Sequence, residues 1–322
     1  MAAEVISPNS AFINGPLTDF ASKYANSQFV GDRLVKPFLV DQIGATFKKR
    51  LRVDEATLVD DAVGPDSRLN EVSYKVEDDL YLCRPRGLAH PSGKLTQAVS
   101  NSALDPKQVG IANLMQHIML LRENRVASLI MTAGNWASGN TSAVTNDWDD
   151  ETNGKPVTDM KAGLQAIPFN GEDVDVFGVC SDIVWDKVSL HPQVMSLRSN
   201  GGTEGGPAAP SELARYLGIA DILVSKVHKN TAAPGLTASY SRVWGADSFA
   251  FVVVPKQVVS TEQMMFGANF MFNIEGGTNG IRVREWFDPG RGQGGTDMTA
   301  VELSDQAKVI QNDAGYLFTS VV

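Results

Sequence analysis

Apolar residues recur at two different spacings along the chain, which indicates a protein of mixed helix and strand. Between residues 111 and 130 they fall three or four positions apart on one broad face, as in a buried amphipathic helix. Asp105 followed by Pro106 is a typical helix start, because Asp caps the first backbone N–H groups and Pro fits the first turn. We therefore expect a helix from residue 105 to about 132, roughly 40 Å long at 1.5 Å per residue.

Shorter elements are expected after this helix. They are strands at 173–179 and 221–227, a capped helix at 210–217 stopped by Gly218, and two strands within 241–254 joined by a turn at 245–247. From Phe266 onward the pattern favours strands separated by glycine turns, at 266–274, 280–288, 296–311 and 314–322. This order predicts a compact α+β block, roughly 168–262, inserted into a larger domain that the long helix and the late strands build.

Two segments before the long helix have too few apolar residues for a core of their own. Residues 1 to about 40 are polar and turn-rich, which predicts an extended arm. Residues 44–54 and 70–84 have strand-like composition, and the polar Gly-Pro segment between them predicts a long hairpin. Because an isolated two-stranded ribbon is at best marginally stable in water, we expect the hairpin to lie on another surface.

The charges of the hairpin indicate what that surface is. Within residues 44–86, eight basic and nine acidic residues nearly balance. Such a mixture suits ion pairing with a neighbouring subunit, although a solvated hairpin with its charges in water is the alternative. The candidate inter-subunit contacts are Lys48, Lys49, Arg50, Arg52, Glu77, Asp78, Asp79, Arg84 and Arg86.

Composition narrows the class of protein. With 322 residues, 43% of them apolar, the chain can bury a sizeable core or form two domains. The net charge of −9 argues against a protein that grips nucleic acid through its phosphates. Cys83 and Cys180 have no paired spacing, so neither a disulfide framework nor a zinc site is indicated. No apolar run approaches the ~18 residues of a membrane span, and the N-terminus lacks a secretion signal, so we expect a soluble protein made in a cytoplasm.

One stretch, DDETNGKPVTDM at 149–160, follows a calcium loop for half its length. Asp149, Glu151, Asn153 and Gly154 take loop positions 1, 3, 5 and 6. Position 12, however, is Met160 instead of the bidentate Glu that completes the oxygen shell. The alternative is a turn that leads into a helix over 159–167 with Thr158 as its cap. We favour the turn and assign no metal site.

The remaining motifs give no support for an enzyme. Glycine-rich stretches at 199–206 and 290–295 lack the Lys-Ser/Thr of a phosphate loop and predict flexible surface loops. There is no nucleophile elbow and no zinc-binding helix motif in the sequence. No catalytic residue and no cofactor site is therefore assigned.

Eight segments in order resemble the major capsid protein of tailed bacteriophages, whose fold is named after phage Hong Kong 97. They span nearly the whole chain, so their order is more specific than any one of them. The segments are FVGDRLVKPFLV (29–40), GATFKKRL (44–51), DDLYLCRPRGLAHP (78–91), DPKQVGIANLMQHIMLLRENRVASLI (105–130), HPQVMSL (191–197), PSELARYLGIADILVSK (210–226), YSRVWGADSFAFVVVP (240–255) and AGYLFTSVV (314–322).

The resemblance implies an α+β, Hong Kong 97-like fold with named parts. These are an N-terminal arm (1–42), an extended-loop hairpin (43–95), a peripheral domain with a long spine helix (96–167 and 263–322) and an axial domain (168–262). It also implies that the hairpin and the arm gain stability by lying on neighbouring subunits.

The implied function is mechanical. Copies of the chain would form pentamers and hexamers of an icosahedral shell, which matures by expansion and encloses double-stranded DNA without binding it specifically. The shell would assemble in the host bacterial cytoplasm and persist in the virion, with scaffolding, portal and decoration proteins as further partners and no membrane. An acidic inner wall suits this role, because like charges repel within a Debye length of about 8 Å.

Two features of some relatives, an N-terminal scaffold-like domain and a covalent crosslink between subunits, are not expected in this chain. Only about 40 residues precede the hairpin, so we expect a separate scaffolding protein, or none. Lys75 and Lys94 do not match the family's crosslinking motif, so we expect no isopeptide bond. The alternative functions are an encapsulin nanocompartment shell, which shares the fold, and a soluble α+β enzyme.

Overall fold

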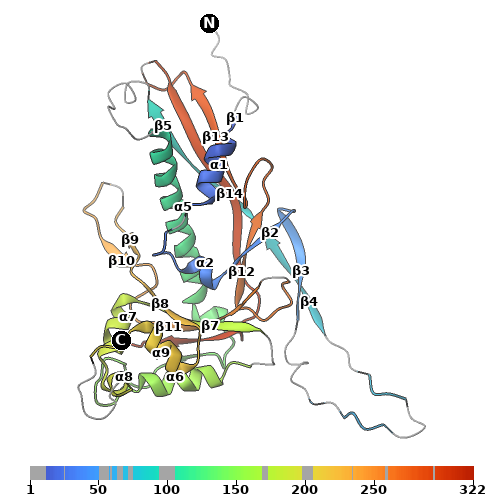
Figure 1. The fold of residues 1–322 in the computed structure, drawn as a ribbon, viewed down its shortest axis with the longest axis vertical. Coiled ribbons are helices and arrows are strands. Elements are labelled where there is room, and N and C mark those ends of the chain that lie inside the picture. Colours follow the sequence, from blue (N-terminus) through green and yellow to red (C-terminus); the bar gives the residue numbers. More distant parts are fainter. Residues whose placement is uncertain are drawn as a thin grey trace.

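A computed structural model shows an elongated molecule with one sheet at each end (Figure 1). A six-stranded sheet lies along a long helix, and a five-stranded sheet with shorter helices forms the other end. The prediction of mixed helix and strand is confirmed. The structure describes residues 12–24, 26–50, 58, 60–63, 68–71, 75–93, 106–168, 173–197, 206–233, 235–257, 260–292 and 294–322.

The long helix, α5 (Pro106–Ile130), confirms the expected amphipathic helix. Its Ile111, Met115 and Ile118 pack against Val301 and Leu303 of the six-stranded sheet. Burying such side chains stabilises the fold by about 1.5–3 kcal/mol each. The strands of this sheet, in order, are β1 (Phe12–Ile13), β13 (Ile281–Asp288), β14 (Thr296–Val309), β12 (Gly267–Phe272) and β2 (Pro37–Val40), with β5 (Arg84–Gly93) also paired to β14.

The five-stranded sheet is built around β11 (Phe249–Pro255), all seven residues of which are buried. Because it is covered on both faces, this strand is a continuous apolar run instead of an alternating one. The strand order is β6 (Thr141–Ala143), β15 (Gly315–Thr319), β11, β7 (Val174–Ser181) and β8 (Asp221–Ser225). Thus β6 and β15, which lie outside the predicted axial segment 168–262, share its sheet.

The helices of this end are α6 (Pro156–Gln165), α7 (Asp182–Leu190), α8 (Pro192–Ser196) and α9 (Pro210–Leu217). The prediction for α9 is confirmed: Gly218 follows it in the left-handed conformation, with φ of 75°. The prediction that Thr158 caps α6 is wrong, because the helix starts at Pro156, whose ring suits the first helical position. Helices α7 and α8 were not predicted from periodicity.

The described part of the arm, residues 12–40, packs on its own chain. Helices α1 (Gly15–Ser22) and α2 (Gly31–Leu34) lie against α5, β1 pairs with β13, and β2 runs parallel to β12. The scattered apolar residues of this segment enter cores of the same molecule: Ala21, Val30, Leu34, Val35 and Val40 are buried. This corrects the expectation that the arm gains its stability on a neighbour, at least for these residues.

Two strands near residue 245 are present as predicted, but they do not pair with each other. Strand β10 (Tyr240–Arg242) pairs with β9 (His228–Asn230) to form a separate ribbon, whereas β11 enters the five-stranded sheet. Among the described helices, none combines the length and apolarity that crossing a bilayer requires.

Candidate assembly site

The predicted hairpin is present in the described residues and forms a two-stranded sheet of its own beside the six-stranded sheet (Figure 1). Strand β3 (Gly44–Arg50) pairs antiparallel with β4 (Val76–Leu82) and with no other described strand. Only Cys83 separates β4 from β5, so the hairpin continues directly out of the six-stranded sheet.

Aromatic stacking fixes the base of this hairpin to the sheet. The rings of Tyr81 and Phe270 are stacked with centroids 4.5 Å apart, and the ring of Phe47 lies 5.1 Å from that of Phe270. Phe270 on β12 is fully buried, and Cys83 is 1% exposed beside it. The stack attaches β3 and β4 where they leave the body.

A lysine on β14 adds polar contacts to this base. Lys308 Nζ donates to Asp79 Oδ1 and to the Leu80 carbonyl, each at 2.5 Å. Burial alone would raise the pKa of Asp79, but hydrogen bonds from Lys308 and from the Leu80 N–H outweigh it and lower that pKa. Gln306 Oε1 accepts from the Leu82 N–H at 2.6 Å, which extends the same attachment by two residues along β4.

Removing this lysine should loosen the hairpin without unfolding the protein. Because both partners are partly exposed, Lys308→Met is expected to cost about 1 kcal/mol or less of global stability. Amide hydrogen exchange at Leu80 and Leu82 is expected to speed up at least several-fold. Lys256→Met, which breaks an exposed pair with Asp173, is the control and should leave those two amides unchanged. Equal exchange rates in both variants would contradict the proposed attachment.

The nine predicted contact residues do not form one cluster. Lys49 pairs with Glu77 across the hairpin at 3.3 Å, Asp79 with Lys308, and Arg86 with Asp305 at 2.6 Å. Three of the remaining residues are exposed and form no ion pair with another described residue: Lys48, Asp78 and Arg84. The last two, Arg50 and Arg52, have side chains outside the part of the chain that the structure describes.

Exposed apolar side chains add a feature that the charge pattern did not show. Val76, Leu80 and Leu82 share one face of β4 with the exposed Asp78, which lies between Val76 and Leu80. The three apolar side chains are 45%, 57% and 54% exposed. Farther out, Leu58 is 99% and Leu69 78% exposed. An apolar face of this kind is typical of a surface that another protein covers.

Two buried carboxylates hold the framework from which the hairpin projects. Asp305 on β14, with its side chain 1% exposed, lies 2.6 Å from Arg86 Nε on β5 and 2.8 Å from Arg125 Nη2 on α5. Burial lowers the pKa of Arg125, an effect that the Asp305 carboxylate opposes. The group therefore ties the long helix to the two strands beside the hairpin.

Glu123 joins three parts of the chain. From α5 it accepts hydrogen bonds from the Val30 N–H at 3.0 Å, the Gly31 N–H at 2.8 Å and Trp244 Nε1 at 2.6 Å. Burial raises the pKa of Glu123, although these hydrogen bonds act in the opposite direction. The arm, the long helix and the loop before β11 thus meet at one carboxylate.

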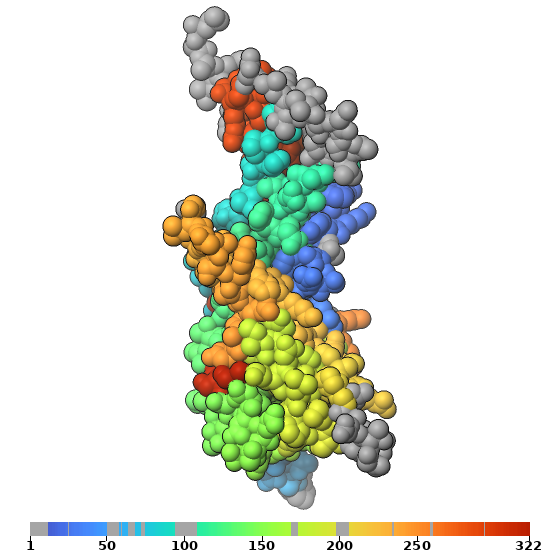
Figure 2. All heavy atoms as spheres, turned by 90° about the vertical axis from the view of Figure 1, so that its left-hand side faces the viewer, coloured from blue at the N-terminus to red at the C-terminus, as the bar shows by residue number. Residues whose placement is uncertain are grey.

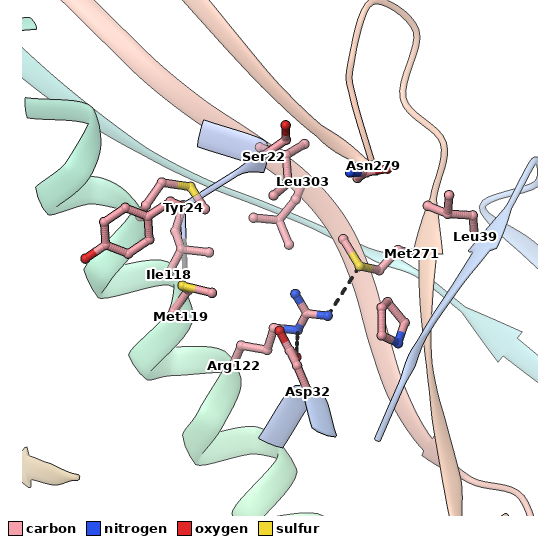
Figure 3. A pocket seen from close by; sticks show the side chains of 13 residues that line it. Ser22, Tyr24, Asp32, Leu39, Ile118, Met119, Arg122, Met271, Asn279 and Leu303 are labelled. Carbon is pink, nitrogen blue, oxygen red and sulfur yellow. Dashed lines mark hydrogen bonds and ion pairs between the residues drawn. The ribbon is translucent and has the colours of Figure 1, made fainter. Parts of the chain in front are cut away.

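A cavity of about 400 Å³ lies between the arm, α5 and the sheet (Figure 3). Met115, Met119 and Met271 line it, and Arg122 points into it. The Arg122 Nε lies 3.0 Å from Asp32 Oδ1, and its Nη2 lies 3.4 Å from the Met271 sulfur. Arg122 and Asp32 thus form an ion pair at the wall of a cavity that is otherwise lined mostly by apolar side chains.

The calcium-like stretch forms a turn organised by a residue outside the proposed ligand set. Asp150 Oδ1 accepts from the backbone N–H groups of Thr152 and Asn153 at 2.9 and 3.1 Å. The Asn153 side-chain amide donates to Asp150 Oδ2 at 2.8 Å, and this bond is the largest cause of a lowered Asp150 pKa. Across the described part of the chain, no group of three or more His, Cys, Asp or Glu side chains is arranged to hold a metal ion.

Comparison with known proteins identifies the fold. No family model matches the sequence. The major capsid protein of Pseudomonas phage JBD67 is 24% identical over 316 residues, which cover 96% of this chain and 97% of that protein. A phage-related protein from Bordetella bronchiseptica RB50 has a TM-score of 0.73 at 14% identity, covering 97% of this chain and 98% of that one. A chain of the cyanophage P-SCSP1u capsid has a TM-score of 0.57 at 12% identity, covering 99% and 91%.

The fold is therefore that of the phage capsid proteins, and the predicted Hong Kong 97-like architecture is confirmed. Within that class, the curated relative confirms the predicted function, that of a major capsid protein. Its name favours this function over the encapsulin shell and over a soluble enzyme.

Proposed function

We propose that copies of this chain assemble as pentamers and hexamers into the icosahedral shell of a tailed phage, which encloses double-stranded DNA. The observation that carries this proposal is the hairpin, which is attached at its base and exposes Val76, Leu80 and Leu82 on one face. A second copy supplies the cover that this face lacks, and the growing lattice repeats the contact.

The chain's role in this proposal is structural, without catalysis or cofactor. Assembly takes place in the host cytoplasm, and the finished shell is part of the virion. Scaffolding, portal and decoration proteins are the further partners, and the DNA is held by enclosure. The net charge of −9 supports this, because an acidic wall does not bind phosphates.

Particle size tests the proposal directly. The purified chain, concentrated under assembly conditions, should sediment as capsomers and closed particles, and negative-stain microscopy should show rings and shells. A small oligomer that persists at every concentration, with or without a co-expressed scaffolding protein, would exclude a shell protein.

Charge reversal on the hairpin tests the predicted inter-subunit contacts. Lys48 and Arg84 are the best positions, because both are exposed and neither has an ion-pair partner among the described residues. The double variant Lys48→Glu, Arg84→Glu is expected to lower particle yield at least tenfold, while the unfolding midpoint of the unassembled chain changes little. The matched control, Lys48→Arg with Arg84→Lys, keeps both charges and should assemble normally. Normal particles from the reversed variant would show that these charges stay in water.

A further inference from the structure

A second thin projection leaves the body on the side opposite the hairpin (Figure 1). It is the ribbon of β9 and β10 with the loop between them, residues 228–242, in which three residue pairs join the strands. In Figure 2 the same ribbon stands out from the surface on the side away from the arm. Neither the ribbon nor its position was predicted from the sequence.

The base of the ribbon is fixed to the body by polar contacts. Lys229 Nζ donates to Asn124 Oδ1 on α5 at 2.9 Å. Arg242 pairs with Asp182 on α7 at 2.5 Å and also contacts His228 Nδ1 at 2.9 Å. Two different helices therefore set the direction in which the ribbon points.

Asn230 joins the two sides of the loop between β9 and β10. Its Oδ1 accepts from the N–H groups of Ala232 and Ser239, at 3.0 Å each, which closes the loop. The Thr231 N–H donates to the Ser239 carbonyl at 2.8 Å, and the Leu236 N–H to the Ala233 carbonyl at 3.1 Å. A loop ordered in advance loses little further conformational entropy when it binds.

The tip lacks charged residues and exposes one large apolar and one aromatic side chain. From Asn230 to Tyr240 the sequence NTAAPGLTASY contains no charged residue, in a chain of which 20% is charged. Leu236 is 71% and Tyr240 70% exposed. Depletion of charge together with an exposed Tyr is typical of the centre of a protein–protein interface.

We propose that the tip of the β9–β10 ribbon docks on a second copy of this chain, and this inference rests on the proposed shell function. A loop tip of this size covers far less than the ~1,200–2,000 Å² of a stable two-protein interface, so it acts within a larger contact. Repeated copies of one chain provide such a contact. The two projections on opposite sides suit a head-to-tail arrangement, in which each copy reaches toward a different neighbour.

A substitution at the tip tests the inference. Leu236→Asp is expected to reduce particle yield at least tenfold, with the unfolding midpoint of the unassembled chain unchanged, whereas Leu236→Met should assemble as the parent does. Normal particle yield from Leu236→Asp would overturn the inference and leave the shell function intact. If the parent chain itself formed no particles, the proposed shell function would be overturned, and the tip inference that rests on it would fall with it.

A crosslink identifies the partner. With the photoreactive p-benzoylphenylalanine in place of Leu236, illuminated particles should give covalent dimers of the 34.6 kDa chain, and the dilute unassembled chain should give none. Intact particles without dimers, or with crosslinks only to a different protein, would refute docking on a second copy.

Discussion

Replacing Asp305 with Asn is expected to lower the free energy of unfolding of the unassembled chain by about 3–5 kcal/mol, because it removes a buried carboxylate that pairs with two arginines. Arg86 and Arg125 approach it from β5 and α5. The substitution preserves the shape of the side chain, so the loss reports the missing charge and the one acceptor oxygen that the amide NH2 replaces. Urea unfolding followed by circular dichroism measures it.

The matched control for this variant is an exposed aspartate in an ion pair. Asp173→Asn breaks the ion pair with Lys256. The side chain of Asp173 is 78% exposed and that of Lys256 is 51% exposed. Water screens such a pair, so the unfolding midpoint should not change measurably. If the two variants were equally stable, the Asp305 group would not hold the helix to the sheet.

The second large effect is expected at Glu123. Glu123→Ala leaves the N–H groups of Val30, Gly31 and Trp244 without their acceptor inside the protein. Leaving a buried donor unpaired costs about 1–3 kcal/mol. Because the costs of the three donors do not add fully, the free energy of unfolding should fall by roughly 3–5 kcal/mol in total. Urea unfolding at constant pH measures this loss.

The loss at Glu123 should also depend on pH. Burial raises the pKa of the folded-state carboxyl above its ordinary value of 4.5. The folded state therefore binds more protons between 4.5 and the raised pKa, so the stabilisation from this group is complete below pH 4.5 and is lost as the pH rises through the folded-state pKa. The stability difference between the parent and Glu123→Ala should be larger at pH 5 than at pH 8. The reverse order would contradict a raised pKa.

Glu123→Gln separates charge from shape in the same experiment. The amide keeps one acceptor oxygen and the volume of the side chain, so it should lose less stability than Ala. Because Gln does not titrate, its own contribution should be independent of pH. A Gln variant with the same pH dependence as the parent would assign that dependence to another group.

Periodicity identified the elements that local sequence determines. The helix α5 and the strands β7, β8 and β12–β15 follow patterns of apolar residues that their own segments contain. The helix α9 was found at both ends, because Pro210 and Gly218 are local signals. The arm differs: its strands exist because β12 and β13, more than 200 residues later, accept them.

The buried polar groups were missed because their partners are distant in sequence. Glu123 precedes Val126 by three residues and Ile130 by seven, so it lies on the buried face of α5, and this position was a usable signal. For Asp305 and Lys308 the strand alternation gave no such indication, because their partners come from β5, α5 and β4. The charged hairpin was predicted correctly as an element, but the side-chain pairs within it depend on cross-strand register.

The single residue between β4 and β5 has a geometric consequence. Strand β5 is bonded along its whole length to β14, and at Cys83 the same strand direction passes into β4. The seven residues of β4 span about 23 Å, and because Tyr81 is stacked on Phe270, the six-stranded sheet sets the direction in which the outer end of β4 points. In the proposed shell, the direction of β14 therefore decides which neighbouring copy the hairpin reaches.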